Sequence, residues 1–250
     1  MSGLFYNLGK KVGPKVRKVK WFWQSIAGTE EDAIKVEHEV GLDLAHEVRN
    51  QLQIIRQPQN EKILNEISRR LTACVVKKSR KFKFEVVKGT EPNAFALPGG
   101  FIFVTNSLLE LCQFDQNEIA FILAHEMGHV IRGHSMARII SNSAIATASR
   151  AAPIRGAFSG WLRKVGVQFL ESAYSQDMES EADKLGVRLV AAARYEPQEC
   201  VRLLSRLAKL SKPVGQFDLG SYFSSHPAFD VRIRNINHWI HKWKLQKKLS

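Results

Sequence analysis

The amino-acid sequence predicts an α+β fold that is mostly helical, with a small mixed or antiparallel sheet. Apolar residues recur at helical spacing in many segments, the stretch 82–105 contains short runs with strand character, and an apolar run from about residue 116 follows a helix-start signal. These three observations lead to the class. With 250 residues, of which 44% are hydrophobic, the chain is long enough for one substantial domain.

The predicted elements follow one another in a mixed order. A long helix is expected at 30–55, because acids occupy its first turn and apolar side chains follow at mixed helical spacing. FKFEVVKG (82–89) predicts a strand, and NAFALPGGFIFVT (93–105) predicts two short strands joined at the Pro-Gly-Gly sequence. Further helices are expected at about 60–73, near 106–112, from 116, at 177–194, at 196–211 and from about 228.

Positive charge is concentrated at the two ends of the chain. Residues 1–24 and 231–250 each carry six basic side chains and no acid, which leaves +1 of the net +13 for the body. A nucleic-acid-binding protein would more often spread positive charge along a cleft in its body, so nucleic acid is disfavoured as a partner. Basic ends suit an anionic membrane surface or a solubilising tail.

The N-terminal segment is predicted to be separate from the main domain. A helical wheel over 4–26 gathers the apolar side chains in one sector and leaves most lysines outside it. Two alternatives stay open: the apolar stripe packs on the protein body, or the helix lies on an anionic membrane. We therefore expect a basic amphipathic segment at 1–28 and a single domain at 29–250 that ends in a basic helix containing tryptophan.

The sequence also bears on location. Three scattered cysteines with no C-x-x-C pair suit a reducing compartment. No secretory signal and no convincing membrane span are predicted. We expect a cytoplasmic or peripherally membrane-associated protein, or a mitochondrial one if the source is eukaryotic, because the acid-free basic start also resembles a mitochondrial presequence.

The stretch AHEMGH (124–129) contains an H-E-x-x-H motif. Asp115 followed by Glu118 is a capping-box pattern and predicts a helix from residue 116. Such a helix places His125 and His129 on one face, where both imidazoles can bind one metal ion. Glu126 then lies on the adjoining flank, in the position of the general base of a zinc hydrolase. The alternative is a helix that is merely rich in histidine.

A third histidine, His134, does not extend the motif in an obvious way. If the helix continues, His134, nine residues after His125, lies half a turn away from the face that binds metal and cannot bind the same ion. The spacing of metzincins would place the third histidine at residue 135, which is Ser135. We therefore expect His134 to be structural or to bond to the surroundings of the helix.

A third ligand is expected from DMESEADKLG (177–186). Glu179 and Asp183 are four residues apart and share a helical face, whereas Glu181 points away from it. Glu179 could therefore bind zinc while Asp183 accepts a hydrogen bond from a ligand histidine. Without the H-E-x-x-H motif, the same residues would be interpreted as a solvated acidic face.

The motifs AHEMGHVIRGH, MESEADKLG, NAFALPGGFIFVTNSLL and SSHPAFDVRI together resemble gluzincin metallopeptidases of family forty-eight, which includes HtpX, BepA and CAAX prenyl endopeptidases and a stress-activated mitochondrial inner-membrane protease. The resemblance covers roughly 30–240 in order. It implies a zincin-like fold and one zinc ion bound by His125, His129 and Glu179.

The last of these motifs, H-P-x-x-x-x-R-I, contains His226 and Arg232. The resemblance implies that His226 lies near the zinc, where it caps the metal in a resting state or helps to stabilise the oxyanion. Arg232 is the second residue of this motif to which we extend a catalytic role, since a nearby cation stabilises developing negative charge. The alternative is that His226 only caps the last helix.

We expect a zinc metalloendopeptidase in which Glu126 is general base toward a zinc-activated water. An extended or unfolded polypeptide would pair with an edge strand, and 141–168 is a candidate lid. The strand residues are Asn93, Ala94, Phe95 and Ala96. The resemblance implies protein quality control. The rival is a non-catalytic, chaperone-like module of zincin fold at a membrane surface, which the presence of Glu126 disfavours.

Overall fold

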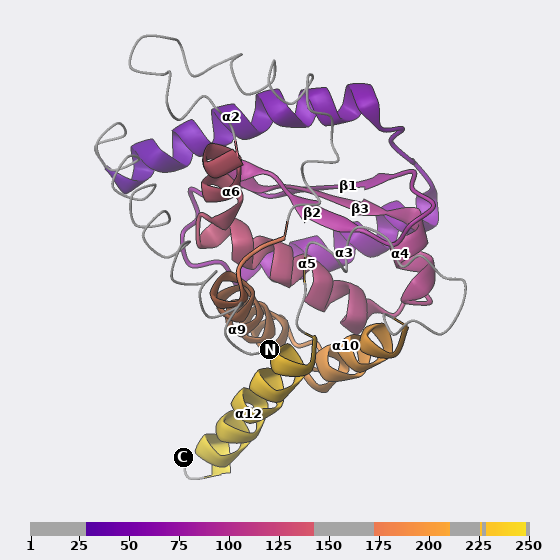
Figure 1. Ribbon diagram of the computed structural model, residues 1–250, viewed down its shortest axis with the longest axis vertical. Coiled ribbons are helices and arrows are strands. Elements are labelled where there is room, and N and C mark those ends of the chain that lie inside the picture. The colour runs from indigo at the N-terminus through magenta and orange to yellow at the C-terminus, as the bar shows by residue number, and fades with distance from the viewer. Residues whose placement is uncertain (1–28, 143–172, 211–225, 227–228, 249–250) are drawn as a thin grey trace, which may run out of the picture.

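The computed structural model describes residues 29–142, 173–210, 226 and 229–248. The predicted basic segment at 1–28 lies outside these residues, as does nearly all of the candidate lid at 141–168. The described chain forms a small sheet enclosed by helices, which confirms the predicted fold class (Figure 1).

The sheet has three strands and is mixed. The strands are β1 (Lys83–Val87), β2 (Ala94–Ala96) and β3 (Phe101–Thr105). β3 lies in the centre, parallel to β1 and antiparallel to β2. β2 is therefore an edge strand, as expected.

The turn between β2 and β3 is the short 3-10 helix η1 (Pro98–Gly100), at the predicted Pro-Gly-Gly sequence. Gly99 and Gly100 have φ angles of 72° and 90°, in the region that favours glycine. A Cβ on Gly100 would lie 2.0 Å from the carbonyl oxygen of Lys81. The turn therefore requires glycine for its backbone conformation and for the close approach of the neighbouring loop.

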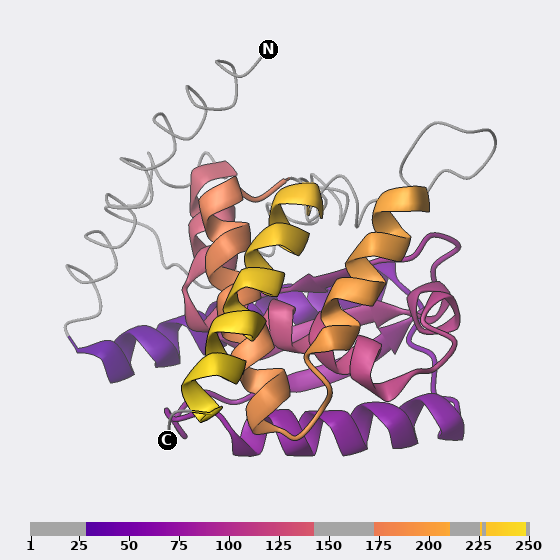
Figure 2. The ribbon, with the colours of Figure 1, turned by 90° about the horizontal axis from the view of Figure 1, so that it is seen from below.

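Helices cover both faces of the sheet. Figure 1 shows α2 (Glu30–Gln51) on one face, and α3 (Pro58–Ala73) and α5 (Gln116–Ile131) on the other. In Figure 2 the later helices form an outer layer: α9 (Gln176–Ala192), α10 (Gln198–Leu210) and α12 (Phe229–Lys248). Two short helices precede and follow α5: α4 (Asn106–Leu111) and α6 (His134–Asn142). In the described part of the chain, every helix is too short or too polar to cross a bilayer.

The central strand β3 divides the interior into two cores. Phe101 and Phe103 pack with α2, while Ile102 and Val104 pack with the helices on the opposite face. This alternation is the period of two that a strand imposes. Because both faces are covered, the whole strand is buried, and its first four residues, Phe-Ile-Phe-Val, form a continuous apolar run.

The first helix is shorter than predicted. α2 ends at Gln51, not near residue 55, because the chain turns to extend beside β1. Ile54 forms an antiparallel bridge with Val87, and the Ile55 N–H donates to the Val86 carbonyl at 2.8 Å. These main-chain bonds outweigh the helical pattern of the last residues.

α5 begins where the capping pattern predicts. The Asp115 side chain accepts hydrogen bonds from the N–H groups of Asn117 and Glu118, at 2.8 and 3.0 Å. The reciprocal half of a capping box is missing, because the Glu118 carboxylate pairs with Arg206 instead. The expected capping box is therefore wrong in this detail, although the helix start is confirmed.

Candidate metal centre

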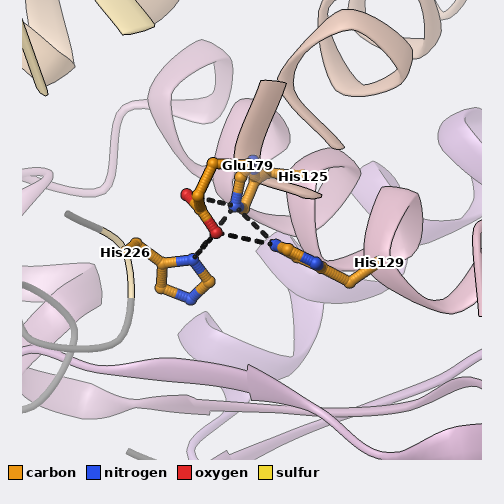
Figure 3. Close-up of side chains that lie close together, drawn as sticks. All are labelled: His125, His129, Glu179 and His226. Atoms are coloured by element: carbon orange, nitrogen blue, oxygen red, sulfur yellow. Dashed lines mark hydrogen bonds and ion pairs between the residues drawn. The ribbon is translucent and has the colours of Figure 1, made fainter. Parts of the chain in front are cut away.

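The H-E-x-x-H motif lies in a helix that is buried over most of its length. Residues 118–130 of α5 are all buried, and His125, Glu126 and His129 are each 0% exposed. Nε2 of His125 lies 3.1 Å from Nε2 of His129 (Figure 3). The four-residue spacing has thus brought one nitrogen of each ring to the same point.

Two glycines let α9 approach this point closely. A Cβ on Gly128 of α5 would lie 2.9 Å from the carbonyl oxygen of Ala182, and a Cβ on Gly186 of α9 would lie 3.1 Å from the backbone nitrogen of His125. The two helices are therefore in backbone contact at the level of the motif. This close approach brings the first turn of α9 to the histidines.

Glu179 is the residue of α9 that meets both imidazoles. Its Oε1 lies 3.2 Å from Nε2 of His129, and its Oε2 lies 3.6 Å from Nε2 of His125. Glu179 is placed here because Ser175 caps α9, accepting a hydrogen bond from the Met178 N–H. The structure therefore brings together the three residues expected to bind metal.

His226 adds a fourth nitrogen to the group. Its Nδ1 lies 2.9 Å from Oε1 of Glu179 and 3.2 Å from Nε2 of His125 (Figure 3). The four residues each offer one ligand atom, and these atoms all lie within 4.8 Å of one another. On its other side, Nε2 of His226 lies 3.3 Å from Oε1 of Glu126.

Asp183 and Arg232 lie directly behind the donors. Oδ1 of Asp183 lies 2.9 Å from Nδ1 of His125, the ring nitrogen opposite the donor side. Arg232 is 2% exposed and donates to both oxygens of Asp183, each at 2.8 Å. Its Nη1 lies 3.1 Å from Oε2 of Glu179 and donates to the His226 carbonyl at 3.3 Å. Arg232 thus holds the residues of the site to one another.

The charges of these buried groups are set by their neighbours. Burial alone would raise the pKa of Glu179, but His226 and Arg232 outweigh it and hold that pKa well below its usual value. Burial would likewise raise the pKa of Asp183, but Arg232 outweighs burial and lowers that pKa. Both carboxylates are therefore held in the ionised form, which binds metal ions and accepts hydrogen bonds from imidazole.

The imidazoles differ in protonation. Burial lowers the pKa of His129 to about 4, which leaves a neutral ring, the form that binds metal. Burial also acts to lower the pKa of His226, but Glu179 and Glu126 raise it to about 9. His226 is therefore a cation between two carboxylates at neutral pH.

His134 lies closer to the site than the sequence argument allowed. The predicted separation holds only for a continuous helix. In the structure α5 ends at Ile131, and Gly133, with a φ of 74°, turns the chain before α6. Nδ1 of His134 then faces Nδ1 of His129 at 3.1 Å. Burial lowers the pKa of His134 to about 2, so the ring is neutral.

Sequence reasoning missed one aromatic neighbour of the site. The Tyr174 ring stacks on the His129 ring, with centroids 3.8 Å apart and an interplanar angle of 16°. On the Tyr174 ring lies the guanidinium of Arg138, with its Cζ 4.2 Å from the Tyr174 ring centroid. The available signal was an aromatic residue directly before the serine cap of α9, which is weak without the structure.

The expected substrate strand lies close to the site. β2 packs against α5, and the side chains of Ala94, Phe95 and Ala96 are buried. Asn93 pairs with Thr105 through its backbone oxygen, which accepts from the Thr105 N–H at 2.9 Å. On the outer edge, Arg138 donates to the Ala96 carbonyl at 3.3 Å.

The donor set fits a divalent metal ion. Two imidazole nitrogens and a carboxylate are the ligand types of catalytic zinc sites. Oε2 of the adjoining Glu126 is buried and accepts no hydrogen bond from the described residues, so one carboxylate oxygen beside the donors remains to receive a proton. A small α+β fold with this site defines a metal-dependent hydrolase class.

Comparison with known proteins gives the particular family. Residues 58–240 match the model described as peptidase family M48, and the chain belongs to that family, which implies a metal cofactor. Three relatives illustrate the similarity. "Mitochondrial metalloendopeptidase OMA1" of Schizosaccharomyces pombe is 28% identical over 191 residues, which are 75% of this chain and 55% of the relative.

The other two relatives come from yeast and a bacterium. "Mitochondrial metalloendopeptidase OMA1" of Saccharomyces cerevisiae is 32% identical over 169 residues, or 65% of this chain and 48% of the relative. "Beta-barrel assembly-enhancing protease" of Yersinia pestis is 26% identical over 227 residues, or 85% of this chain and 45% of the relative. The chain thus spans about half the length of these relatives.

Proposed function

We propose that the chain is a zinc-dependent metalloendopeptidase. The observation that carries this proposal is the convergence of His125, His129 and Glu179 beside the buried carboxylate of Glu126. The names of the relatives and membership of the peptidase family support the same activity.

In this proposal three side chains hold the zinc ion: His125 and His129 through Nε2, and Glu179 through its carboxylate. When bound, zinc supplies a Lewis acid that polarises the scissile carbonyl and lowers the pKa of a water molecule. Asp183 accepts the Nδ1 proton of His125 and so fixes the tautomer that leaves Nε2 free for the metal.

Glu126 is the proposed general base. Its free Oε2 takes a proton from the attacking water, and the same carboxyl group then passes the proton to the leaving amine. Burial would raise the pKa of Glu126, but His226 outweighs it and lowers that pKa, so the carboxylate is ionised before the reaction.

His226 and Arg232 are proposed to act in different ways. His226 lies beside the three donors as a cation held by Glu179 and Glu126. It would cap the metal only as a neutral ring, after losing a proton, whereas the charged ring turned toward the substrate would stabilise the oxyanion. Arg232 contacts Asp183 and Glu179, so we assign it electrostatic support of the site through those carboxylates.

The proposed substrate is an extended or unfolded polypeptide that adds to the edge of β2, since main-chain pairing accepts many sequences. A role in protein quality control, and a mitochondrial location if the source is eukaryotic, are proposed from the relatives named above.

We also propose that the basic ends meet an anionic membrane, which is supported by the exposed side chains of Arg234 and Lys242 on α12. The test is binding of the protein to anionic liposomes with and without about 0.5 M salt. Liposome binding that persists at the higher salt, or DNA binding as strong as liposome binding, would contradict an electrostatic membrane contact.

The test of the activity is the Glu126→Gln variant, assayed for casein cleavage and for zinc content. We expect zinc to be retained and cleavage to fall by roughly 10²–10⁴-fold, because only the base is lost. Glu61→Gln, at an exposed position of α3, is the matched control and should cleave like the wild type. A Glu126→Gln variant that holds zinc and cleaves at the wild-type rate would show that the mechanism is wrong.

A further inference from the structure

The ring of His129 is contacted on both of its nitrogens. Nε2 faces the donor group, at 3.1 Å from Nε2 of His125 and 3.2 Å from Oε1 of Glu179. Nδ1 faces away from that group and lies 3.1 Å from Nδ1 of His134. His134 is 4% exposed, so this contact is shielded from water.

Two imidazole nitrogens at this distance must share a single proton, since two N–H groups would repel and two lone pairs would leave a buried acceptor unsatisfied. If Nε2 of His129 presents its lone pair to a metal, the proton of that ring is on Nδ1. His134 must then accept through Nδ1 and carry its own proton on Nε2. That nitrogen faces Oε2 of Glu181, at 3.6 Å.

The two candidate ligands of α5 therefore have unlike supports. His125 is held by the carboxylate of Asp183, which is 0% exposed. His129 is held by a neutral imidazole, and behind that imidazole is Glu181, whose side chain is 57% exposed and lies 3.8 Å from Arg132. The support of His125 is wholly internal, whereas that of His129 leads to the surface.

The backbone and an aromatic ring keep His134 and His129 in this arrangement. The left-handed conformation of Gly133 makes His134 the first residue of α6, so the side chain turns back toward α5. Tyr174 lies flat against the other face of His129. The ring of His129 is thus fixed by a stacked neighbour and by one hydrogen bond at its edge.

We propose that His134 is a positioning residue of the metal centre, which accepts the Nδ1 proton of His129 and so holds His129 in the tautomer and orientation that bind zinc. This inference rests on the proposed function, because it assigns the support of one of its zinc ligands. His134 itself touches neither substrate nor metal in this assignment.

The first experiment exchanges the acceptor and measures zinc affinity of the full chain by competition with a chromophoric chelator. His134→Leu removes the acceptor and should weaken zinc binding by about 10- to 100-fold. His134→Asn places an amide oxygen near the position of Nδ1 and should restore most of that affinity. His238→Leu, which makes the same substitution at an exposed position of α12, is the matched control and should bind zinc like the wild type.

A second experiment does not depend on a variant that folds. Nitrogen-15 NMR of histidine-labelled, zinc-loaded protein should show His134 with its proton on Nε2 and His129 with its proton on Nδ1. His134 with its proton on Nδ1, or equal zinc affinity in the Leu and Asn variants and the wild type, would overturn the inference. Both readouts omit substrate, so a chain that binds zinc but cleaves nothing would refute the proposed function separately.

Discussion

Arg232 and Asp183 form a fully buried pair joined by two hydrogen bonds of 2.8 Å, and the same carboxylate lies 2.9 Å from Nδ1 of His125. One side chain of α9 therefore connects the last helix to the helix of the H-E-x-x-H motif. Loss of its charge must affect the packing of α12 and the orientation of His125 together.

Asp183→Asn is expected to weaken zinc binding by about tenfold or more, because the amide holds the His125 tautomer less well. The free energy of unfolding should also fall by about 3 kcal/mol, since Arg232 loses the charged group that accepts two of its hydrogen bonds. Chelator competition and urea unfolding measure the two effects. Asp177→Asn, at an exposed position of the same helix, should change neither. Unchanged zinc affinity in Asp183→Asn would show that Asp183 does not orient His125.

Gly128→Ala tests the close contact of α5 and α9. The new Cβ would meet the carbonyl oxygen of Ala182 at 2.9 Å, so the helices must separate and carry Glu179 away from the histidines. We expect a loss of about 1–3 kcal/mol in stability and weaker zinc binding. Ala191→Gly, on the exposed side of α9, should cost about 1 kcal/mol through helix propensity and leave zinc affinity unchanged. Zinc affinity that survives in Gly128→Ala would mean that the donors tolerate a wider helix spacing.

Arg206→Gln should destabilise the protein in a pH-dependent manner. Burial raises the pKa of Glu118 and Arg206 opposes that rise, so removal of Arg206 raises the pKa further. A carboxyl whose pKa is higher in the folded than in the unfolded state penalises folding at high pH, and the penalty fades as pH falls toward the unfolded value of 4.5. We expect a loss of about 1–2 kcal/mol at neutral pH and a smaller loss at about pH 5.

Urea unfolding at the two pH values measures this difference. Arg202→Gln is the matched control, because its partner Glu199 is on the same helix and the Arg202 side chain is 73% exposed. Exposed pairs of this kind contribute little, so its stability should be nearly unchanged at both pH values. A larger loss at the lower pH in Arg206→Gln would contradict the assignment.

Pairing of substrate with β2 has a signature in the substrate backbone. Asn93 and Leu97 direct their main-chain groups to β3, so those of Ala94 and Ala96 face the outer edge, where a substrate strand would take the place of Arg138 at the Ala96 carbonyl. Peptides N-methylated at every second residue should then be cleaved poorly in one register and normally in the other. The ratio of kcat/KM between the two registers measures this effect. Equal cleavage in both registers would exclude strand addition.

Most of the fold could be predicted because its signals are local. The helix that carries His125 and His129 follows from its cap and its apolar run, and the Pro-Gly-Gly turn follows from backbone conformations that only glycine readily adopts. Glu179 could be selected because helical spacing sets it apart from Glu181, and the structure bears out that division, since Glu181 is on the exposed side.

The parts that could not be predicted depend on long-range contacts. The end of α5 is one example: Gly133 breaks the helix, and only the packed structure shows that His134 then returns to His129. Tyr174 is another, since its stacking on His129 joins residues far apart in the chain. Arg232 could be placed near the site by motif, but its two bonds to Asp183 require the docking of α12 on α9.

The candidate metal ligands come from α5, from α9 and from His226, three residues before the start of α12, and among the described residues the sheet supplies none of the clustered donors. Bond cleavage and peptide recognition are therefore assigned to different building blocks, a pair of crossing helices and a strand edge. Substitutions at the neighbours of β2, such as Arg138, would then change substrate specificity without changing the helices that carry the candidate metal ligands.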